Sequence, residues 1–372
     1  MFKSITNKNH NSDLPILAIT QDQGAVPRDQ IEYNVTVTDK SLSNYKVVEV
    51  GDFIISLRSF QGEIEYSRFK GICSPAYIIL RKREENISEL YYKYFFKTWR
   101  YIQSLNRNLE GIRDGKMISY SQFSSVKVPY PRSFKEQQKI ADCLSSIDEL
   151  IDAENRKLKA LEKYKKGLMQ KLFPAEGKTL PEWRFPEFRG KSEWRIKPLG
   201  KICTNYDSRR IPITEKDRVK GEIPYIGASG VIDYINDFIF DEDLLCVSED
   251  GANLVARTYP IAFSISEKTW VNNHAHVLKF SHKYTQDIVE SYLNMINLQD
   301  FLTGMAQPKL NRAKLDIIPI PLPEEEEQQK IAGCLSDVDT MITEQSNKVE
   351  QLKAHKKGLM QGLFPSLEEA DV

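Results

Sequence analysis

Short clusters of Arg, Asn, Gln, Lys and Ser are the groupings in this sequence that could do chemistry, and the chemistry they suit is contact with nucleic acid. Arg, Asn and Gln form paired hydrogen bonds with base edges, whereas Lys and Ser mostly bind phosphate. A charged surface in water is the alternative interpretation of each residue, and the segment 307–311 also suits a structural element at a domain exit. The candidate DNA contacts are Arg58, Gln61, Arg68, Lys70, Arg113, Lys116, Ser208, Arg209, Arg210, Asn272, Asn273, Gln307, Lys309, Asn311 and Arg312.

The sequence shows no catalytic constellation. It has no GxxxxGK[ST] phosphate loop, no GxGxxG after a strand, no GxSxG elbow and no acidic-Pro-Pro-aromatic tetrapeptide of an amino-methyltransferase. The 5 cysteines form no CxxC pair, so we expect reduced structural thiols and no metal site. We expect packing or surface roles for His274 and His276. This chain is therefore expected to have no catalytic residues and to bind no metal or cofactor.

Composition indicates a soluble multidomain protein. The chain has 372 residues, of which 41% are hydrophobic, enough to bury sizeable cores. Lys and Arg number 52, as do Asp and Glu, so any nucleic-acid contact must come from local basic patches. The opening MFKSITNKNHNSD has no apolar segment of a signal peptide, and no apolar run reaches membrane-spanning length. We expect a cytoplasmic protein.

The chain that must position the candidate contacts contains one stretch twice. Residues 136–174 begin with EQQKIA and end with KKGLMQKLFP, and residues 327–365 repeat this as EQQKIA and KKGLMQGLFP. Apolar residues at alternating spacings of three and four predict one coiled-coil helix in each copy, whose simplest partner is the other copy. Polar residues interrupt both seams at equivalent positions, Glu154 with Gln345 and Lys165 with Lys356. The predicted seam consists of Ile140, Leu144, Ile147, Ile151, Leu158, Leu161, Leu168, Leu172, Ile331, Leu335, Val338, Ile342, Val349, Leu352, Leu359 and Leu363.

A mixed domain precedes each predicted helix. Short β-branched stretches predict strands near 14–20, 45–50, 53–57 and 76–80, then near 223–226, 244–248, 261–265 and 275–280. Apolar faces predict helices over 87–106 and 285–303. The second domain also has a leading segment near Trp194 that the first lacks, so the first domain is expected to be short at its N-terminus. The predicted divisions are 1–131, first domain; 132–174, first long helix; 175–190, linker; 191–323, second domain; 324–365, second long helix; and 366–372, tail.

The duplicated EQQKIA and KKGLMQ-LFP motifs, each after a proline-rich exit ending in VPYP or IPIPLP, resemble the specificity subunit of type I restriction-modification systems over essentially the whole chain. The resemblance implies an α+β fold. It would consist of two similar mixed α/β target-recognition domains separated by a pair of long antiparallel coiled-coil helices, a pseudo-two-fold internal repeat. Each domain would read one half of a bipartite double-stranded DNA site.

The same resemblance implies the partners. Two methyltransferase (modification) subunits would dock on the central helices, and restriction or translocase subunits could join them. S-adenosylmethionine and ATP are expected on those partner subunits, which would carry out methylation and cleavage. Because the two domains of this chain differ in sequence, the two half-sites should differ as well.

The sequence is compatible with three classes of function. The leading one is a non-catalytic, sequence-specific DNA-binding subunit. A self-contained nuclease or modification enzyme would need catalytic motifs, which this sequence lacks. A coiled-coil adaptor that joins protein partners without touching DNA would show no salt-dependent DNA affinity.

If the helices set the spacing between half-sites, lengthening them should lengthen the spacer. Inserting four residues in the middle of each predicted helix adds about 6 Å and turns the helix by about 400°, which keeps the seam nearly in phase. We expect unchanged half-site bases and a spacer longer by about one or two base pairs, at about 3.4 Å each. Genome-wide mapping of methylation by the reconstituted complex measures this. An unchanged spacer in an active complex would contradict it.

Overall fold

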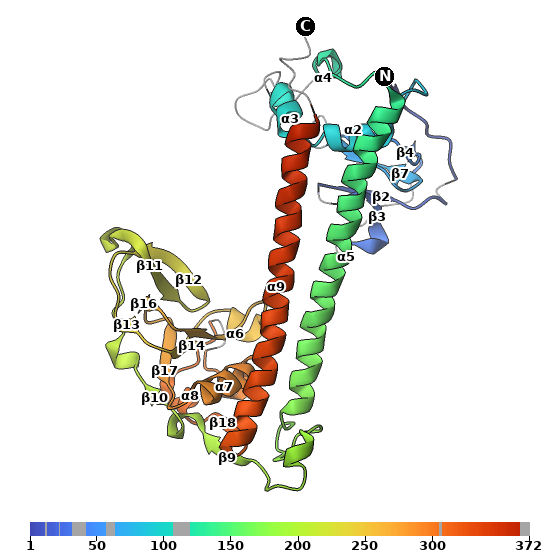
Figure 1. The fold of residues 1–372 in the computed structure, drawn as a ribbon. Helices are drawn as coiled ribbons and strands as arrows, with labels where there is room; N and C mark the ends of the chain where they lie inside the picture. Colours follow the sequence, from blue (N-terminus) through green and yellow to red (C-terminus); the bar gives the residue numbers. More distant parts are fainter. Residues whose placement is uncertain are drawn as a thin grey trace. The chain divides into compact units, whose positions relative to one another are not determined.

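The computed structural model describes residues 1–11, 13–21, 23–31, 42–56, 64–106, 120–304 and 307–364. The chain divides into two compact units. Unit 1 comprises Met1–Asn155 with Asn347–Val372, and unit 2 comprises Arg156–Ser346. Each unit holds one mixed domain and parts of both long helices (Figure 1). Among the described residues, no helix is long and apolar enough to span a membrane.

The domain of unit 1 is built from short strands followed by short helices. Its elements are β1 (Phe2–Ile5), β2 (Leu17–Thr20), β3 (Gly24–Pro27), η1 (Arg28–Gln30), β4 (Lys46–Val48), β5 (Phe53–Ile55), β6 (Ile64–Tyr66), β7 (Gly71–Cys73), β8 (Ile78–Lys82), α2 (Glu89–Phe95), α3 (Trp99–Asn106) and α4 (Tyr120–Ser125). β5 and β7 are fully buried, as expected of strands made of apolar residues.

The domain of unit 2 repeats this plan. Its elements are β9 (Arg195–Pro198), η3 (Leu199–Lys201), β10 (Thr204–Asn205), η4 (Asp207–Arg209), η5 (Glu215–Asp217), β11 (Lys220–Gly227), β12 (Gly230–Ile235), β13 (Phe240–Asp241), β14 (Leu244–Ser248), α6 (Asn253–Ala256), β15 (Ala262–Ile265), β16 (Lys268–Val271), β17 (Ala275–Lys279), α7 (Lys283–Met295), η6 (Gln299–Phe301), α8 (Arg312–Asp316) and β18 (Pro319–Leu322). A linker containing η2 (Pro186–Phe188) precedes them.

Strand pairing shows that the two domains share one topology. The order β1-β8-β5-β6 in unit 1 matches β10-β17-β14-β15 in unit 2, and every pair is antiparallel. The second sheet of unit 2 runs β12-β11-β16-β13, with β11 and β16 parallel. In unit 1 the pairs β2-β3 and β4-β7 follow the same order, joined by a parallel bridge between Ile16 and Ile72. The internal repeat is therefore confirmed in the fold.

The leading segment of unit 2 forms an additional strand pair. β9 pairs antiparallel with β18, the IPIPLP exit, with Arg195 opposite Leu322. In unit 1 the corresponding exit residues 127–130 are not in a strand.

Two expectations for the helices are corrected by the structure. The helix expected over 87–106 is two helices, because the Thr98 hydroxyl bonds the Phe95 carbonyl at 2.7 Å and accepts from the Tyr101 N–H at 3.4 Å, starting a new helix. The helix expected over 285–303 ends at Met295 and gives way to the short turn η6.

Two helices of 39 residues, α5 (Phe134–Leu172) and α9 (Glu325–Leu363), carry the duplicated stretch. They are paired antiparallel, as ion pairs in each unit show. In unit 1 Lys356 contacts Asp148 at 2.5 Å, and in unit 2 Lys165 contacts Asp339 at 2.5 Å. Asp148 and Asp339 are equivalent positions of the repeat, and so are Lys165 and Lys356. The two ion pairs are therefore the same contact with α5 and α9 exchanged. The polar interruptions Lys165 and Lys356 thus form interhelical ion pairs, and the expected fold class is confirmed.

The predicted seam residues all lie on buried or half-buried positions. The buried ones are Leu144, Ile151 and Leu172 in α5 and Ile331, Leu335, Val338 and Val349 in α9. The others, Ile140, Ile147, Leu158, Leu161, Leu168, Ile342, Leu352, Leu359 and Leu363, are half-buried.

The ends of the long helices belong to the domain cores. In unit 1 the start of α5 and the end of α9 pack into the aromatic core through Leu144 and Phe364. In unit 2 the start of α9 and the end of α5 do the same through Ile331, Leu335 and Phe173. Each domain is therefore fixed to both helices, because removing the helix ends would open its core.

The repeated EQQ motif provides a buried glutamine in each unit. The Gln137 side chain donates to the Pro131 carbonyl at 2.8 Å and accepts from the Ser88 N–H at 2.9 Å, where α2 begins. The Gln328 side chain donates to the Pro323 carbonyl at 2.9 Å and accepts from the Thr285 hydroxyl at 2.8 Å, in the first turn of α7. Each glutamine ties the proline-rich exit to a domain helix.

Three residues of the acidic run 324–327 lie in the first turn of α9, where the helix dipole favours negative charge. Glu327 has a further role. It is 1% exposed and accepts two hydrogen bonds at 2.7 Å from Arg184 of the linker. These charge-assisted bonds raise the pKa of Arg184 despite its partial burial.

We predict that Gln328→Ala lowers the free energy of unfolding by about 1–3 kcal/mol. The substitution removes the side chain that binds both the Pro323 carbonyl and the Thr285 hydroxyl. Gln137→Ala should behave alike. The matched controls are Gln329→Ala and Gln138→Ala, one position along each helix, where less buried side chains should change stability by no more than about 0.5 kcal/mol. Urea unfolding followed by circular dichroism measures the four variants. If a control variant lost as much stability as the variant of its neighbouring buried glutamine, the role assigned to the buried glutamines would be contradicted.

Candidate nucleic-acid interface

The candidate contacts of the first domain are only partly covered by the structure. Arg58, Gln61, Arg113 and Lys116 lie outside the described residues. Arg68 and Lys70 are exposed in the connection from β6 to β7, and Lys70 pairs with Glu49 at 3.0 Å. Most of the candidate contacts that the structure describes therefore lie in the second domain.

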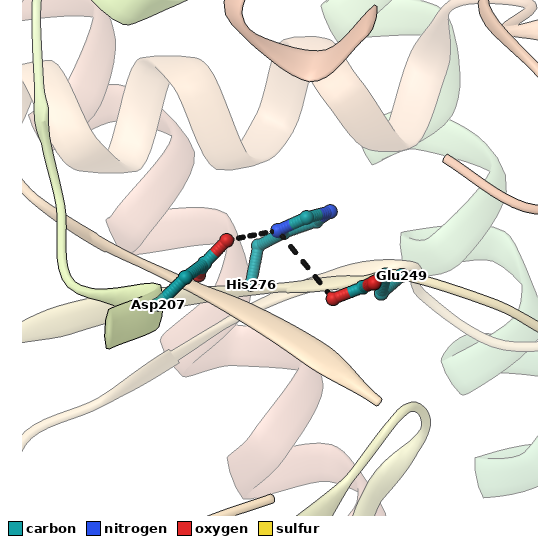
Figure 2. Close-up of side chains that lie close together, drawn as sticks. All are labelled: Asp207, Glu249 and His276. Atoms are coloured by element: carbon teal, nitrogen blue, oxygen red, sulfur yellow. Dashed lines mark hydrogen bonds and ion pairs between the residues drawn. The ribbon is translucent and has the colours of Figure 1, made fainter. Parts of the chain in front are cut away.

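A cluster of charged side chains lies at one end of the β10-β17-β14-β15 sheet. Asp207 comes from η4, Glu249 follows the end of β14, and His276 lies on β17 (Figure 2). The His276 ring is 1% exposed, with Nδ1 at 2.6 Å from Asp207 and 3.8 Å from Glu249. His276 Nε2 lies 2.7 Å from the Leu310 carbonyl oxygen.

These contacts assign a positive charge to His276. The Leu310 carbonyl can only accept, so Nε2 carries a proton, and Nδ1 needs a second proton to bond the Asp207 carboxylate. With both ring nitrogens donating, His276 has no lone pair for a metal ion. Asp207, Glu249 and His276 lie close enough to hold a metal, but their ligand atoms already bind one another and Arg210. The donor set suits a buried ion network.

Arg210 completes this network. It bonds Glu249 and the Ala275 carbonyl at 2.8 Å each, and contacts Asp207 at 3.4 Å. Burial acts to raise the pKa of Asp207 and of Glu249. Hydrogen bonds and charges outweigh burial and hold both pKa values below their ordinary range, chiefly through His276 for Asp207 and Arg210 for Glu249.

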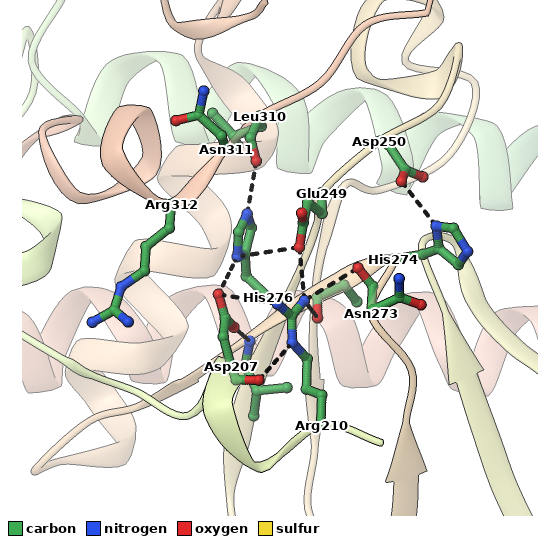
Figure 3. Close-up of polar contacts among 12 residues, drawn as sticks. Asp207, Arg210, Glu249, Asp250, Asn273, His274, His276, Leu310, Asn311 and Arg312 are labelled. Carbon is green, nitrogen blue, oxygen red and sulfur yellow. Dashed lines mark hydrogen bonds and ion pairs between the residues drawn. The ribbon is translucent and has the colours of Figure 1, made fainter. Parts of the chain in front are cut away.

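The network joins four segments that carry the candidate contacts of the second domain. Figure 3 shows Arg210, Asn273, Asn311 and Arg312 around it. The Arg210 guanidinium bonds the Asn273 carbonyl at 3.3 Å, and the Leu310 N–H bonds the Glu249 carbonyl at 2.8 Å. The Gly251 N–H bonds the Pro308 carbonyl at 3.1 Å. Residues 207–210, 249–251, 272–276 and 307–312 thus form one rigid surface.

Comparison with known proteins now gives the family. The family model of the type I restriction modification DNA specificity domain matches residues 1–163 and again residues 191–354. The chain belongs to this family. The double match coincides with the two copies of the domain topology.

Curated relatives carry specificity-subunit names. S.HindORF215P of Haemophilus influenzae, assigned to the type I restriction enzyme specificity subunits, is 33% identical over 153 residues, 41% of this chain and 39% of that protein. The type I restriction enzyme MjaVIII specificity subunit of Methanocaldococcus jannaschii is 26% identical over 352 residues, 88% of this chain and 80% of its own length.

Solved structures show the same fold. The crystal structure of the S subunit of the type I restriction-modification system from M. genitalium has a TM-score of 0.62 at 15% identity, covering 98% of this chain and 94% of that one. A chain from a study of complex assembly and conformational transition of the type I system has a TM-score of 0.57 at 14% identity, covering 98% and 97%.

Within this specificity domain, several candidate contacts turn out to have structural roles. Arg210 is buried in the ion network and does not face solvent as expected. Asn272 is 4% exposed, and its side chain accepts from the His274 N–H at 2.8 Å in the turn between β16 and β17. The Asn311 side chain accepts from the Lys314 N–H at 3.0 Å and caps α8. These side chains bind local backbone groups and charged groups of low exposure, and their role as base contacts stays a prediction.

The remaining candidates of the specificity domain lie on its exposed surface. Ser208, Asn273, Gln307 and Arg312 are exposed. Lys309 is half exposed and pairs with Glu249 at 3.2 Å. Arg209 lies in the short helix η4 and covers the rings of Tyr206 and Phe240 at 4.6 Å and 4.7 Å. These side chains can reach a ligand from a scaffold that does not need to rearrange.

The residues that build the scaffold of this specificity domain were not among the candidates. Asp207 and Glu249 are ordinary surface acids by sequence, and His276 was expected to have a packing or surface role. The only sequence signal was the alternation of His274 and His276, whose rings take different partners, Asp250 at 2.8 Å for His274. Burial of four charges in one place depends on segments far apart in sequence, so local composition could not reveal it.

Arg210→Met should lower the free energy of unfolding by about 1–3 kcal/mol at neutral pH, because Glu249 and Asp207 each lose a charge-assisted contact at a site of low exposure. The control Arg312→Met removes an exposed pair with Asp316 at 3.6 Å and should cost less than about 0.5 kcal/mol. Thermal and urea unfolding of both variants measures the difference.

The same variant has a pH signature. Since the folded pKa values of Asp207 and Glu249 are lowered, their stabilisation is present above about pH 4 and is lost as the pH falls through the folded values. Arg210→Met should therefore lose less stability in acid than the unmodified chain does. Equal acid sensitivity would show that the network does not stabilise these carboxylates.

Proposed function

We propose that this chain is the sequence-specific DNA-binding subunit of a type I restriction-modification complex and has no catalytic activity of its own. The observation that carries the proposal is the surface of the second domain. There, exposed Arg, Asn, Gln and Ser side chains project from segments held by a buried ion network. Such side chains suit base edges and phosphate, and a rigid support lowers the entropy lost on binding.

Each domain would read its own half of an asymmetric, bipartite double-stranded site. The repeated topology supports two readers of one kind. The difference between their side chains supports two different half-sites. In the second domain the readers would be Ser208, Arg209, Asn273, Gln307, Lys309 and Arg312. In the first domain they would be Arg58, Gln61, Arg68, Lys70, Arg113 and Lys116.

The long helices would dock two methyltransferase subunits, one for each copy of the repeat. Leu150 on α5 and Met341 on α9 occupy equivalent positions outside the predicted seam and are 43% and 49% exposed. An apolar side chain exposed at the same position of both copies suits two identical partners. S-adenosylmethionine and ATP would belong to the partner subunits, and the complex would act in the cytoplasm.

A domain exchange tests the proposal. Residues 191–322 are replaced by the corresponding domain of a relative, and the chain is assembled with its methyltransferase partners. The methylated sites should change in one half and keep the other half, because each domain carries its own contacts. Sequencing of methylated genomic DNA gives the result. A change in both halves, or in neither, would overturn the modular assignment. Loss of sequence preference without loss of assembly would favour an adaptor.

A further inference from the structure

Two clefts, one in each unit, are lined by the same positions of the repeat. The cleft of unit 1 has a volume of about 530 Å³ and that of unit 2 about 970 Å³. The end of one long helix and residues of the domain line each cleft, and the cleft of unit 2 is also lined by the start of α9. The shared positions are Lys353, Lys356, Lys357, Met360 and Gln361 in unit 1, and Glu162, Lys165, Lys166, Met169 and Gln170 in unit 2.

The cleft of unit 1 is basic. Its charged lining consists of Lys97, Arg100, Lys353, Lys356 and Lys357, and no acidic side chain occurs among the described residues that line it. Three of these lysines have carboxylate partners outside the lining: Lys97 with Glu65, Lys356 with Asp148 and Lys353 with Glu350. The Arg100 guanidinium donates to the Phe364 carbonyl at 3.1 Å, and it forms no ion pair with a carboxylate among the described residues.

The exposed indole of Trp99 lies at the same cleft. Trp99 is 72% exposed at the start of α3, while Tyr101 and Leu105 of the same helix are buried. Figure 1 shows α3 beside the end of α9 in this unit. The core does not use the indole, which therefore remains available at the wall of the cleft.

The equivalent cleft of unit 2 has a different character. Its lining includes four carboxylates, Glu162, Asp287, Glu290 and Asp339, together with Lys165, Lys166, Arg257 and Lys283. At one shared position the charge is reversed, since Glu162 stands where unit 1 has Lys353. The repeat therefore produces both clefts, and only one of them has a predominantly positive lining.

We propose that the cleft of unit 1 binds the sugar-phosphate backbone of DNA without regard to sequence. This inference rests on the proposed function and adds a contact outside the predicted base readers. Lys357 and Arg100 would approach phosphates, while the Trp99 indole packs against a deoxyribose. Contacts to phosphate and sugar position a protein on duplex DNA and carry no direct sequence information. An acidic peptide would match the charge but would leave the indole unexplained.

The experiment compares variants of the two clefts in the assembled complex. Binding to duplex DNA, with and without the target site, is measured by fluorescence anisotropy over a range of salt concentrations. The variants are Lys357→Glu and Trp99→Ala. The matched controls are Lys166→Glu, the repeat equivalent of Lys357, and Tyr164→Ala, which removes another exposed aromatic side chain (59% exposed).

Lys357→Glu should weaken binding to both DNAs and lower the slope of log affinity against log salt by about one. Trp99→Ala should weaken binding several-fold at every salt concentration with an unchanged slope, because an apolar contact releases no counterions. The preference for the target site should stay the same in both. The two controls should bind like the unmodified chain.

Three results would overturn the inference. The first is normal DNA binding by both variants. The second is an equal loss in Lys166→Glu, which would indicate overall charge. The third is normal DNA binding with loss of the methyltransferase subunits, which would assign the cleft to a protein partner. Thermal unfolding shows whether each variant folds. If Trp99→Ala does not fold, Lys357→Glu alone tests the inference. Absence of salt-dependent DNA binding by the unmodified complex would instead refute the proposed function.

Discussion

Antiparallel pairing of the two long helices is the constraint on which the rest of the structure depends. Lys356 with Asp148, and Lys165 with Asp339, fix the register of the pairing in each unit. Asp148 also accepts a hydrogen bond from Tyr94 of α2 at 2.7 Å. Burial acts to raise the pKa of Asp148, but hydrogen bonds from Lys356 and Tyr94 outweigh it and lower the pKa. One carboxylate therefore joins both helices and a recognition domain.

The repeat gives equivalent positions that serve different purposes. Gln137 and Gln328 keep the same role in both copies, whereas Glu327 is buried against Arg184 and its equivalent Glu136 is exposed. Similarly, Ile78 of β8 pairs with Ile55 of β5, and His276 of β17 pairs with Val247 of β14 at the equivalent position. An apolar pair in one domain is replaced by a buried ion network in the other. Duplication supplied the frame, and the contacts within the frame diverged.

The frame could be predicted from the sequence, and the interface could be predicted only in part. Periodicity located α5 and α9, because a seam is a local, repeating pattern. The coincidence of polar interruptions in both copies was visible in the sequence, whereas the ion pairs of Lys165 and Lys356 with Asp339 and Asp148 were not. Composition did not reveal the contacts that the candidate side chains make. Arg210 binds Glu249 of a distant segment, whereas Asn272 and Asn311 accept from backbone N–H groups two and three residues along the chain. The break at Thr98 depends on one hydroxyl, which propensity does not reveal.

The division of the chain also has a consequence for its synthesis. Unit 2 is a single continuous stretch, Arg156–Ser346, whereas unit 1 needs residues from both ends of the chain. The aromatic core around Tyr91 and Phe95 is completed by Phe364. The domain that leaves the ribosome first must therefore wait, with part of its core uncovered, until almost the whole chain has been made. During translation, the second domain can reach its final structure before the first.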